Sequence, residues 1–255
     1  MVLEKNSVIA VDIGNTSTLF GLFVKGRLVK RHRVLTEALK SLNAKVFKSW
    51  GSTGKVSILI SSVVPGADQE IKRIFKVFGS RATVRFISAK NISHLVVRAN
   101  KEEVGADRVV NAYAAWKLYG KELPLIIVDF GTATTFCAVN GNGEYLGGAI
   151  APGIKISAAA LHEKTAKLPL VDLKKPIKKV IGSTTKEAME SGLYLGYVAM
   201  VEGMVNRFKN ALGGKAKVIG TGGYAPLIWR GTRVIDIIDP DLTLKGLALI
   251  GENND

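Results

Sequence analysis

The chain has 255 residues, enough for one large domain or two modest ones, and its 47% hydrophobic and 22% charged residues are typical of a globular protein. A single cysteine, Cys137, rules out an intramolecular disulfide framework. No apolar run approaches the ~18 residues that a membrane span requires. We therefore expect a cytoplasmic protein that does not associate with membranes.

The net charge is +15, from 36 basic and 21 acidic residues. Such an excess attracts polyanions, which include both nucleic acid and ATP. The basic residues are spread along the chain, and no helix-turn-helix, zinc knuckle or aromatic-rich strand pair accompanies them. The pattern favours a solvated basic surface over a nucleic-acid partner.

The first half of the chain is expected to begin with strands. Apolar runs bounded by turn residues predict strands over residues 8–11, 18–24, 28–34, 56–60 and 83–87. Apolar residues at helical spacing predict helices over residues 37–50 and 67–78, and a third helix from residue 108 to about residue 119. The Lys-Glu-Leu-Pro stretch at residues 121–124 is the predicted domain boundary.

The second half repeats this plan. Strands are predicted over residues 125–128, 134–139, 145–150 and 217–219. Helices are predicted over residues 156–164 and 242–250, and residues 186–212 form either one long helix or two that are broken at Gly192 or Gly196. The similar halves indicate a duplicated α/β protein with domains at residues 1–120 and 121–255.

Two copies of one short pattern stand near the start and the middle of the chain. Asp12-Ile13-Gly14-Asn15-Thr16 and Asp129-Phe130-Gly131-Thr132-Ala133-Thr134 each place an acid, a glycine and hydroxyl groups after an apolar run. A carboxylate at the end of a buried strand is costly unless it holds a metal ion or organises water. The glycine lets the backbone approach a ligand, and Thr hydroxyls with amide groups bind phosphate oxygens. The pair predicts a duplicated phosphate-binding fold that holds a nucleotide from both sides.

The usual nucleotide-binding loops are absent from the sequence. It has no Gly-x-Gly-x-x-Gly that opens a helix, no Walker loop and no protein-kinase signature. The phosphates would therefore be held by hairpin loops at residues 12–18 and 129–135, together with the Thr221-Gly222-Gly223 turn. An ordinary turn remains the alternative for Asp12 and for this last segment.

Further segments in the same order extend the pattern over almost the whole chain. They are Ser61-Ser62-Val63-Val64-Pro65, Gly105-Ala106-Asp107-Arg108, the Gly-Gly-Ala-Ile-Ala-Pro-Gly run at residues 147–153, the Thr-Ala-Lys-Leu-Pro run at 165–169 and the Asp-Leu-Thr-Leu-Lys-Gly-Leu run at 241–247. With these segments the chain resembles the type III pantothenate kinases of the sugar kinase, heat-shock protein and actin superfamily. The resemblance implies two ribonuclease H-like (actin-like ATPase) domains, each with a central mixed sheet. It also implies ATP-dependent phosphorylation of pantothenate, the first step toward coenzyme A.

The same resemblance implies roles for individual residues. ATP would be bound by Asp12, Ile13, Gly14, Asn15, Thr16, Ser17, Thr18, Thr132, Gly222 and Gly223. Pantothenate would be bound by Gly105, Ala106, Asp107, Arg108 and Thr185, and the adjacent Thr184 is the alternative to Thr185. Asp107 would be the catalytic proton acceptor. Asp129 would belong to a monovalent-cation site for K⁺ or NH₄⁺, Mg²⁺ would accompany ATP, and the protein would be a homodimer.

Elementary chemistry agrees with the role of Asp107. A carboxylate with an ordinary pKa of ~3.9 cannot convert an alcohol to an alkoxide beforehand, but it can orient the hydroxyl and accept its proton late in the reaction. The alternative is that Asp107 caps a helix that begins at Arg108. Arg108 would pair with the pantothenate carboxylate, or it would form an ordinary ion pair.

Two other functions stay open at this point. The family includes accessory factors for gene expression, so a non-enzymatic regulatory role is one alternative. The other is a kinase of a different small hydroxylated acceptor, because residues 97–101 lack the tyrosine and the proline that the family commonly carries ahead of Gly105.

Overall fold

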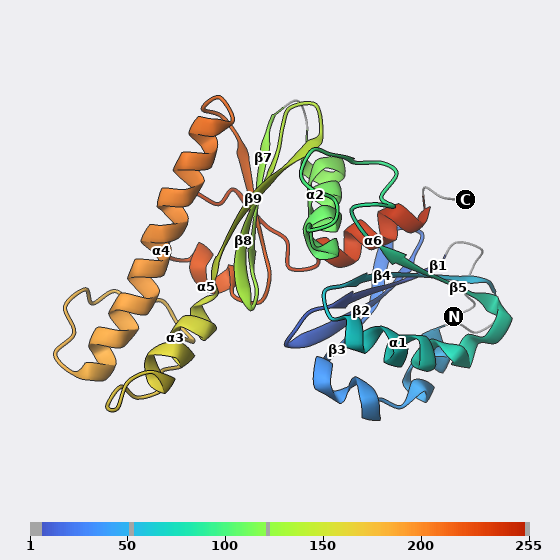
Figure 1. Ribbon diagram of the computed structural model, residues 1–255, viewed down its shortest axis with the longest axis horizontal. Helices are drawn as coiled ribbons and strands as arrows, with labels where there is room; N and C mark the ends of the chain where they lie inside the picture. The colour runs from blue at the N-terminus through green and yellow to red at the C-terminus, as the bar shows by residue number, and fades with distance from the viewer. Residues whose placement is uncertain (1–6, 51–53, 121–122, 253–255) are drawn as a thin grey trace. The chain divides into compact units, whose positions relative to one another are not determined.

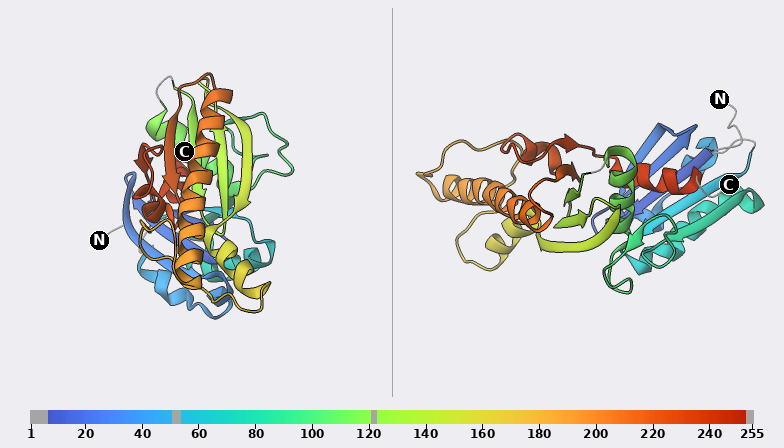
Figure 2. Two further views of the ribbon diagram at one scale, coloured as in Figure 1. Left: turned by 90° about the vertical axis from the view of Figure 1, so that its left-hand side faces the viewer. Right: turned by 90° about the horizontal axis from the view of Figure 1, so that it is seen from above.

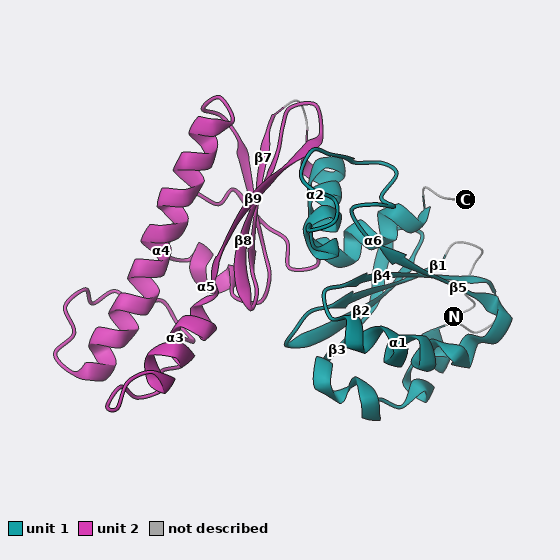
Figure 3. Cartoon of the chain, in the orientation of Figure 1, with its two compact units in different colours: residues 1–118, 242–255 teal, residues 119–241 magenta. Residues whose placement is uncertain are grey.

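The computed structural model describes residues 7–50, 54–120 and 123–252. The chain divides into two compact units, residues 1–118 with 242–255 (unit 1) and residues 119–241 (unit 2), as Figure 3 shows. Each unit has a mixed sheet with helices, so the predicted α/β class with a mixed sheet in each half is confirmed. The predicted domains place residues 242–255 with the second half, whereas these residues belong to unit 1. Residues 121–122 of the predicted boundary lie outside the described residues.

The sheet of unit 1 has the strand order β3-β2-β1-β4-β5. Its strands are β1 (Ser7–Ile13), β2 (Ser17–Val24), β3 (Arg27–Leu35), β4 (Val56–Ser62) and β5 (Ala82–Ile87). The first three form an antiparallel meander, and β4 and β5 run parallel to β1. Lys25 and Gly26 both have positive φ, which matches the two-residue turn that suits the twist of a hairpin. All five predicted strands of this half are therefore confirmed.

Helices cover both faces of this sheet, as Figure 1 shows for α1 and α6. The helices of unit 1 are α1 (Asp68–Phe75), α2 (Ala106–Tyr119) and α6 (Leu242–Glu252), and β6 (Val96–Val97) is a short strand before α2. Alternate residues of β1 enter different cores: Ile9 and Val11 pack on the α1 side, while Val8 lies next to Gly251 of α6. The predicted helix over residues 67–78 ends early, because its last part is the 3₁₀ segment η4 (Lys76–Arg81).

The predicted helix over residues 37–50 is wrong. The segment forms two 3₁₀ turns, η1 (Thr36–Ser41) and η2 (Ala44–Trp50), separated by an extended residue at Leu42. Phe47 and Trp50 are buried and lie three residues apart, with ring centroids 5.1 Å from each other. Residues at i and i+3 align on a 3₁₀ helix, so this spacing buries both rings on one side of a short turn.

Unit 2 repeats the same sheet plan with the strand order β11-β10-β7-β8-β9. Its strands are β7 (Leu125–Phe130), β8 (Ala133–Val139), β9 (Glu144–Pro152), β10 (Lys217–Thr221) and β11 (Ile237–Ile238). Strands β7, β8 and β9 form an antiparallel meander, and β10 runs parallel to β7. The two-residue β11 was not predicted, nor was the two-residue β6, because such short strands show no period.

The helices of unit 2 are α3 (Ile154–Glu163), α4 (Thr185–Ala211) and α5 (Ala225–Trp229). Figure 2 shows α4 as one continuous helix beside the sheet. Gly192 and Gly196 do not break it: both are exposed, and an added Cβ would meet nothing within 4 Å at either position. Val201 and Val205 on the opposite side are fully buried in the core. Across the described part of the chain, no helix is long and apolar enough to cross a membrane.

Candidate active site

The first Asp-x-Gly sequence forms the hairpin between β1 and β2. Asp12 and Ile13 end β1, and Ile13 pairs with Thr18 across the ladder. The turn is closed by the backbone N–H of Gly14, which donates to the carbonyl oxygen of Ser17 at 3.1 Å. Asn15 and Thr16 are exposed at the tip, and Asp12 is half-buried at the base. We call residues 12–18 the first hairpin.

Residues that the sequence analysis did not single out support this turn. The hydroxyl of Thr36 donates to the carbonyl oxygen of Gly14 at 2.6 Å, and its backbone N–H donates to the carbonyl oxygen of Thr16 at 3.2 Å. The hydroxyls of Thr18 and Thr36 lie 3.1 Å apart, and both residues are buried. Arg33 Nη2 donates to Ser17 Oγ at 3.1 Å. A threonine directly before a predicted helix is typical of a cap, so only the pairing of β2 with β3 reveals its contact with the hairpin.

The second Asp-x-Gly sequence forms the equivalent hairpin between β7 and β8. Asp129 pairs with Thr135, and the N–H of Gly131 donates to the carbonyl oxygen of Ala133 at 3.1 Å. Thr132 is exposed at the tip. We call residues 129–135 the second hairpin. The prediction that both motifs occupy hairpin loops agrees with this geometry.

A buried tyrosine of α4 packs against the second hairpin. The hydroxyl of Tyr197 contacts that of Thr134, which is buried within β8. Burial raises the pKa of Tyr197 to about 12, and the negative charge of Asp129 acts in the same direction. Tyr197 therefore stays neutral at physiological pH and keeps its hydroxyl proton.

The Thr221-Gly222-Gly223 turn lies directly against Asp129. Strand β10 pairs with β7 so that Thr221 stands beside Asp129. Gly222 has φ of +89°, and a Cβ at this position would lie 2.4 Å from Asp129 Oδ1 and 2.7 Å from backbone atoms of Phe130. Only glycine fits, because a side chain would meet both the carboxylate and the strand. Gly223 is exposed, with nothing within 4 Å of an added Cβ.

Asp129 offers a carboxylate, which is one of the ligand types that hard cations prefer. Carboxylate and carbonyl oxygens are the ligands that K⁺, Mg²⁺ and similar ions prefer. Within the described ranges no group of three or more His, Cys, Asp or Glu residues could hold a metal ion.

Asp107 lies in the first turn of α2. The helix begins at Ala106, so the alternative that Asp107 caps a helix starting at Arg108 is wrong. Burial raises the pKa of Asp107, while the backbone N–H of Arg108, which donates to Oδ1 at 2.8 Å, and the charge of Arg108 act in the opposite direction. A Cβ on Gly105 would lie 2.5 Å from Asp107 Oδ1, so the glycine leaves room for this orientation of the carboxylate.

A short bridge connects Asp107 with the first hairpin inside unit 1. The backbone N–H of Val63 donates to the carbonyl oxygen of Ile13 at 3.1 Å. The side chain of Val63 also lies 3.6 Å from the Cβ position of Gly105. Three segments far apart in the sequence thus meet: the first hairpin, the Ser-Ser-Val-Val-Pro segment and the Gly-Ala-Asp-Arg segment.

Thr185 and its neighbour differ in their contacts. Thr184 is the N-cap of α4, and its Oγ1 accepts from the backbone N–H of Glu187 at 3.2 Å. Lys179 Nζ lies 2.7 Å from Glu187 Oε2, which lowers the pKa of Glu187 to about 2. Thr185 is the first residue of the helix and is exposed. Of the two hydroxyls, that of Thr184 is occupied by capping, and that of Thr185 faces solvent.

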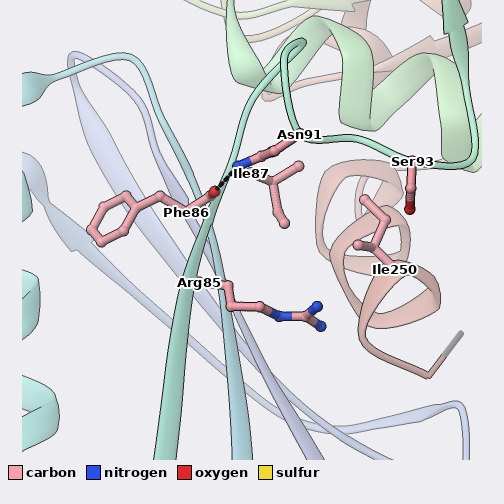
Figure 4. Close-up of a pocket in the computed structure, with 6 residues that line it drawn as sticks. All are labelled: Arg85, Phe86, Ile87, Asn91, Ser93 and Ile250. Carbon is pink, nitrogen blue, oxygen red and sulfur yellow. Dashed lines mark hydrogen bonds between the residues drawn. The ribbon is translucent and has the colours of Figure 1, made fainter. Parts of the chain in front are cut away.

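A pocket elsewhere in unit 1 contains none of these residues. Figure 4 shows it between the end of β5, the following loop and α6. It is lined by Arg85, Phe86, Ile87, Asn91, Ser93 and Ile250. Asn91 Nδ2 donates to the carbonyl oxygen of Phe86, so the amide braces the loop at the pocket mouth.

The duplicated sheets of the chain resemble those of sugar kinases with solved structures. One solved structure of this kind is a ROK family glucokinase from Streptomyces griseus in complex with glucose and AMPPNP, with a TM-score of 0.55 and 13% identity over 97% of this chain and 100% of the other. A likeness at this identity establishes the fold. The chain therefore shares the duplicated mixed-sheet fold of that structure.

Sequence comparison identifies the family. The model for the type III pantothenate kinases matches residues 8–207. Two relatives are similar to this chain over 97% of its length and 96% of their own. They are the type III pantothenate kinases from Dehalococcoides mccartyi (strain CBDB1), 44% identical, and from Koribacter versatilis (strain Ellin345), 40% identical. The chain belongs to the type III pantothenate kinase family, whose members phosphorylate pantothenate with ATP and a divalent metal ion in coenzyme A biosynthesis. The resemblance seen in the sequence is confirmed.

Proposed function

We propose that this chain transfers the γ-phosphoryl group of ATP to the primary hydroxyl of pantothenate, with both hairpins binding ATP and Asp107 accepting the proton. The observation that carries the assignment of residues is the shared hairpin geometry of the two Asp-x-Gly sequences. The bridge from the first hairpin through Val63 to Gly105 supports placing Asp107 near the bound phosphates.

The exposed hairpin tips would bind the triphosphate. Thr16 and Thr132 offer hydroxyls at the two tips, and backbone amides at the tips and in the Gly222-Gly223 turn would be further donors to phosphate oxygens. Phosphoryl transfer depends mainly on positioning and on neutralising charge. Mg²⁺ bound with ATP would supply most of that neutralisation.

Asp107 would receive the hydroxyl proton as the new bond forms. The acceptor oxygen forms a bond to the γ-phosphorus, the bond from that phosphorus to the bridging oxygen breaks, and ADP leaves with the bonding electron pair. The proton moves from the acceptor hydroxyl to Asp107. The burial that raises the pKa of Asp107 makes it a stronger base than an exposed aspartate.

The remaining assignments concern the acceptor, the monovalent cation and the oligomer. Arg108 would pair with the pantothenate carboxylate, and Gly105, Ala106 and Thr185 would line its site. Asp129, held against Gly222, would contribute to a site for K⁺ or NH₄⁺.

A homodimer is supported by two exposed apolar side chains on β9. Leu146 and Ile150 are 42% and 64% exposed, and exposed apolar side chains can mark a contact surface between protein chains. An Ile150→Lys variant should shift the protein from dimer to monomer in analytical ultracentrifugation. A monomeric wild-type protein would refute this part of the proposal.

The test of the function is ADP formation that depends on (R)-pantothenate. We expect turnover with pantothenate, an increase when K⁺ replaces Na⁺, and no turnover with a panel of sugars and polyols. Turnover with one of those acceptors would instead support a different small-molecule kinase. In Asp107→Asn we expect turnover to fall by about 10³-fold while ATP binding persists. Unchanged turnover in this variant would remove Asp107 from the mechanism.

A further inference from the structure

We propose that Arg33 is a further triphosphate-binding residue, a guanidinium that the first hairpin holds in position beside the phosphates. This inference rests on the proposed function, because it takes residues 12–18 as the phosphate-binding turn. No sequence motif marks Arg33, which lies within a run of basic residues on β3. Its position in the structure distinguishes it from the rest of that run.

The geometry fixes one end of the guanidinium and leaves the other open. Arg33 pairs with Leu19 in the β2–β3 ladder, and its Nη2 donates to Ser17 Oγ at 3.1 Å. The residue is exposed, and this bond to Ser17 is the only hydrogen bond or ion pair that its side chain makes with the described residues. A guanidinium has five N–H donors in a planar fork, so several donors remain directed to solvent next to the hairpin.

Such an arrangement suits an anionic ligand. The hydrogen bond to Ser17 restricts the side chain before ATP arrives, which reduces the entropy lost on binding. Arginine binds phosphate oxygens in a bidentate manner and keeps its charge at any physiological pH. Thr36 holds the same turn through its own hydrogen bonds, so the position of the guanidinium relative to the tip of the hairpin stays fixed.

The other interpretation is that Arg33 only stabilises the turn. A structural role predicts a change in stability, with effects on both substrates through the hairpin. A phosphate-binding role predicts a selective loss of ATP affinity. Arg27 provides a matched control, because it is exposed at the opposite end of β3 and pairs with Val24. Six residues of a strand separate the two arginines by roughly 20 Å.

The experiment compares Arg33→Gln, Arg33→Lys and Arg27→Gln in the full-length enzyme. We expect the KM for ATP to rise about tenfold in Arg33→Gln, as for loss of a charge-assisted hydrogen bond, and about threefold in Arg33→Lys, which keeps the charge. The KM for pantothenate and the melting temperature should stay close to the wild-type values. Arg27→Gln should change the KM for ATP by less than about twofold, since that charge is beyond the Debye length. Equal KM values for ATP in Arg33→Gln and Arg27→Gln would overturn the inference.

Calorimetric titration of ATP without pantothenate separates this inference from the proposed function. If the wild-type protein binds ATP but shows no turnover with pantothenate, the proposed function fails. Weaker ATP binding in Arg33→Gln than in Arg27→Gln would then still support the role of Arg33, and equal binding would refute it. A double-mutant cycle with Ser17→Ala adds a second check. We expect the Arg33→Gln effect to shrink when Ser17 no longer holds the guanidinium, whereas additive effects would contradict the positioning step.

Discussion

The two hairpins close in the same way but are supported by different means. In each, the glycine of Asp-x-Gly donates its N–H across the turn, to Ser17 in the first hairpin and to Ala133 in the second. The first is braced by the Thr36 hydroxyl, which donates to the carbonyl oxygen of Gly14. The second has a side-chain contact between the hydroxyls of Tyr197 and Thr134, but its turn is enclosed by glycine backbones, because Gly153 and Gly222 approach it so closely that no side chain fits.

The difference shows that one turn geometry can be maintained by hydrogen bonds from a side chain or by close backbone packing. A hydrogen-bond brace can be removed by one substitution with a modest cost. A packed backbone has no room to adjust, so even one added methyl group displaces it. The two hairpins should therefore respond to substitution with very different magnitudes.

The largest expected effect is at the packed side of the second hairpin. A Cβ on Gly153 would lie 2.2 Å from the carbonyl oxygen of Thr132 and 2.7 Å from that of Gly131. Gly153→Ala should cost about 3 kcal/mol of unfolding free energy in urea denaturation, as overpacking of a rigid site does. Gly131→Ala is the matched control, because its nearest contacts would be at an ordinary 3.5 Å and 3.6 Å. Similar stability losses in the two variants would contradict the packing account.

A smaller effect is expected at the brace of the first hairpin. Thr36→Val keeps the shape of the side chain but removes the bond to Gly14 and the contact with Thr18. Loss of a buried hydroxyl that joins two partners should cost about 1–2 kcal/mol. The KM for ATP should also rise, since the turn loses its fixed geometry. Thr83→Val, at an exposed position of β5, should change neither quantity. An unaltered KM for ATP in Thr36→Val would show that the brace does not matter for binding.

The smallest effect concerns Asp107, which the Val63 bridge connects to the first hairpin. Burial raises the pKa of Asp107 above its usual value in the unfolded chain. The stability linked to this group is then fully present below the unfolded-state pKa and is lost as the pH rises through the higher folded-state pKa. Asp107→Asn should therefore be more stable than the wild-type protein at pH 7, and the difference should shrink toward pH 4. Thermal unfolding at both pH values checks this, and a wild-type protein that is the more stable at pH 7 would refute it.

The sequence was informative where structure depends on near neighbours. Both Asp-x-Gly turns follow apolar runs of strand length, and the strands of both meanders were predicted close to their observed bounds. The 3₁₀ turns were missed because Phe47 and Trp50 have a spacing that also fits an α-helix. The packing of α6 in unit 1 depends on the approach of Gly246 to the carbonyl oxygen of Val110, which no local pattern encodes.

In the candidate site, too, the sequence predicts what depends on short motifs and misses contacts between distant segments. The acid, glycine and hydroxyl residues could be predicted because their chemistry is read from short motifs. The supporting residues could not, since Thr36 reaches the first hairpin through strand register. Val63 likewise contacts Gly105, 42 positions further along the chain.

Calorimetric titration of ATP into Thr16→Val, Thr132→Val and the double variant tests most directly whether both hairpins bind the same nucleotide. The two threonines occupy the exposed tips of the two turns. We predict one ATP per chain, with affinity about fivefold weaker in each single variant, as for loss of one hydrogen bond, and about 25-fold weaker in the double variant. Wild-type affinity in either single variant would contradict the account, because only one hairpin would then contact the bound phosphates.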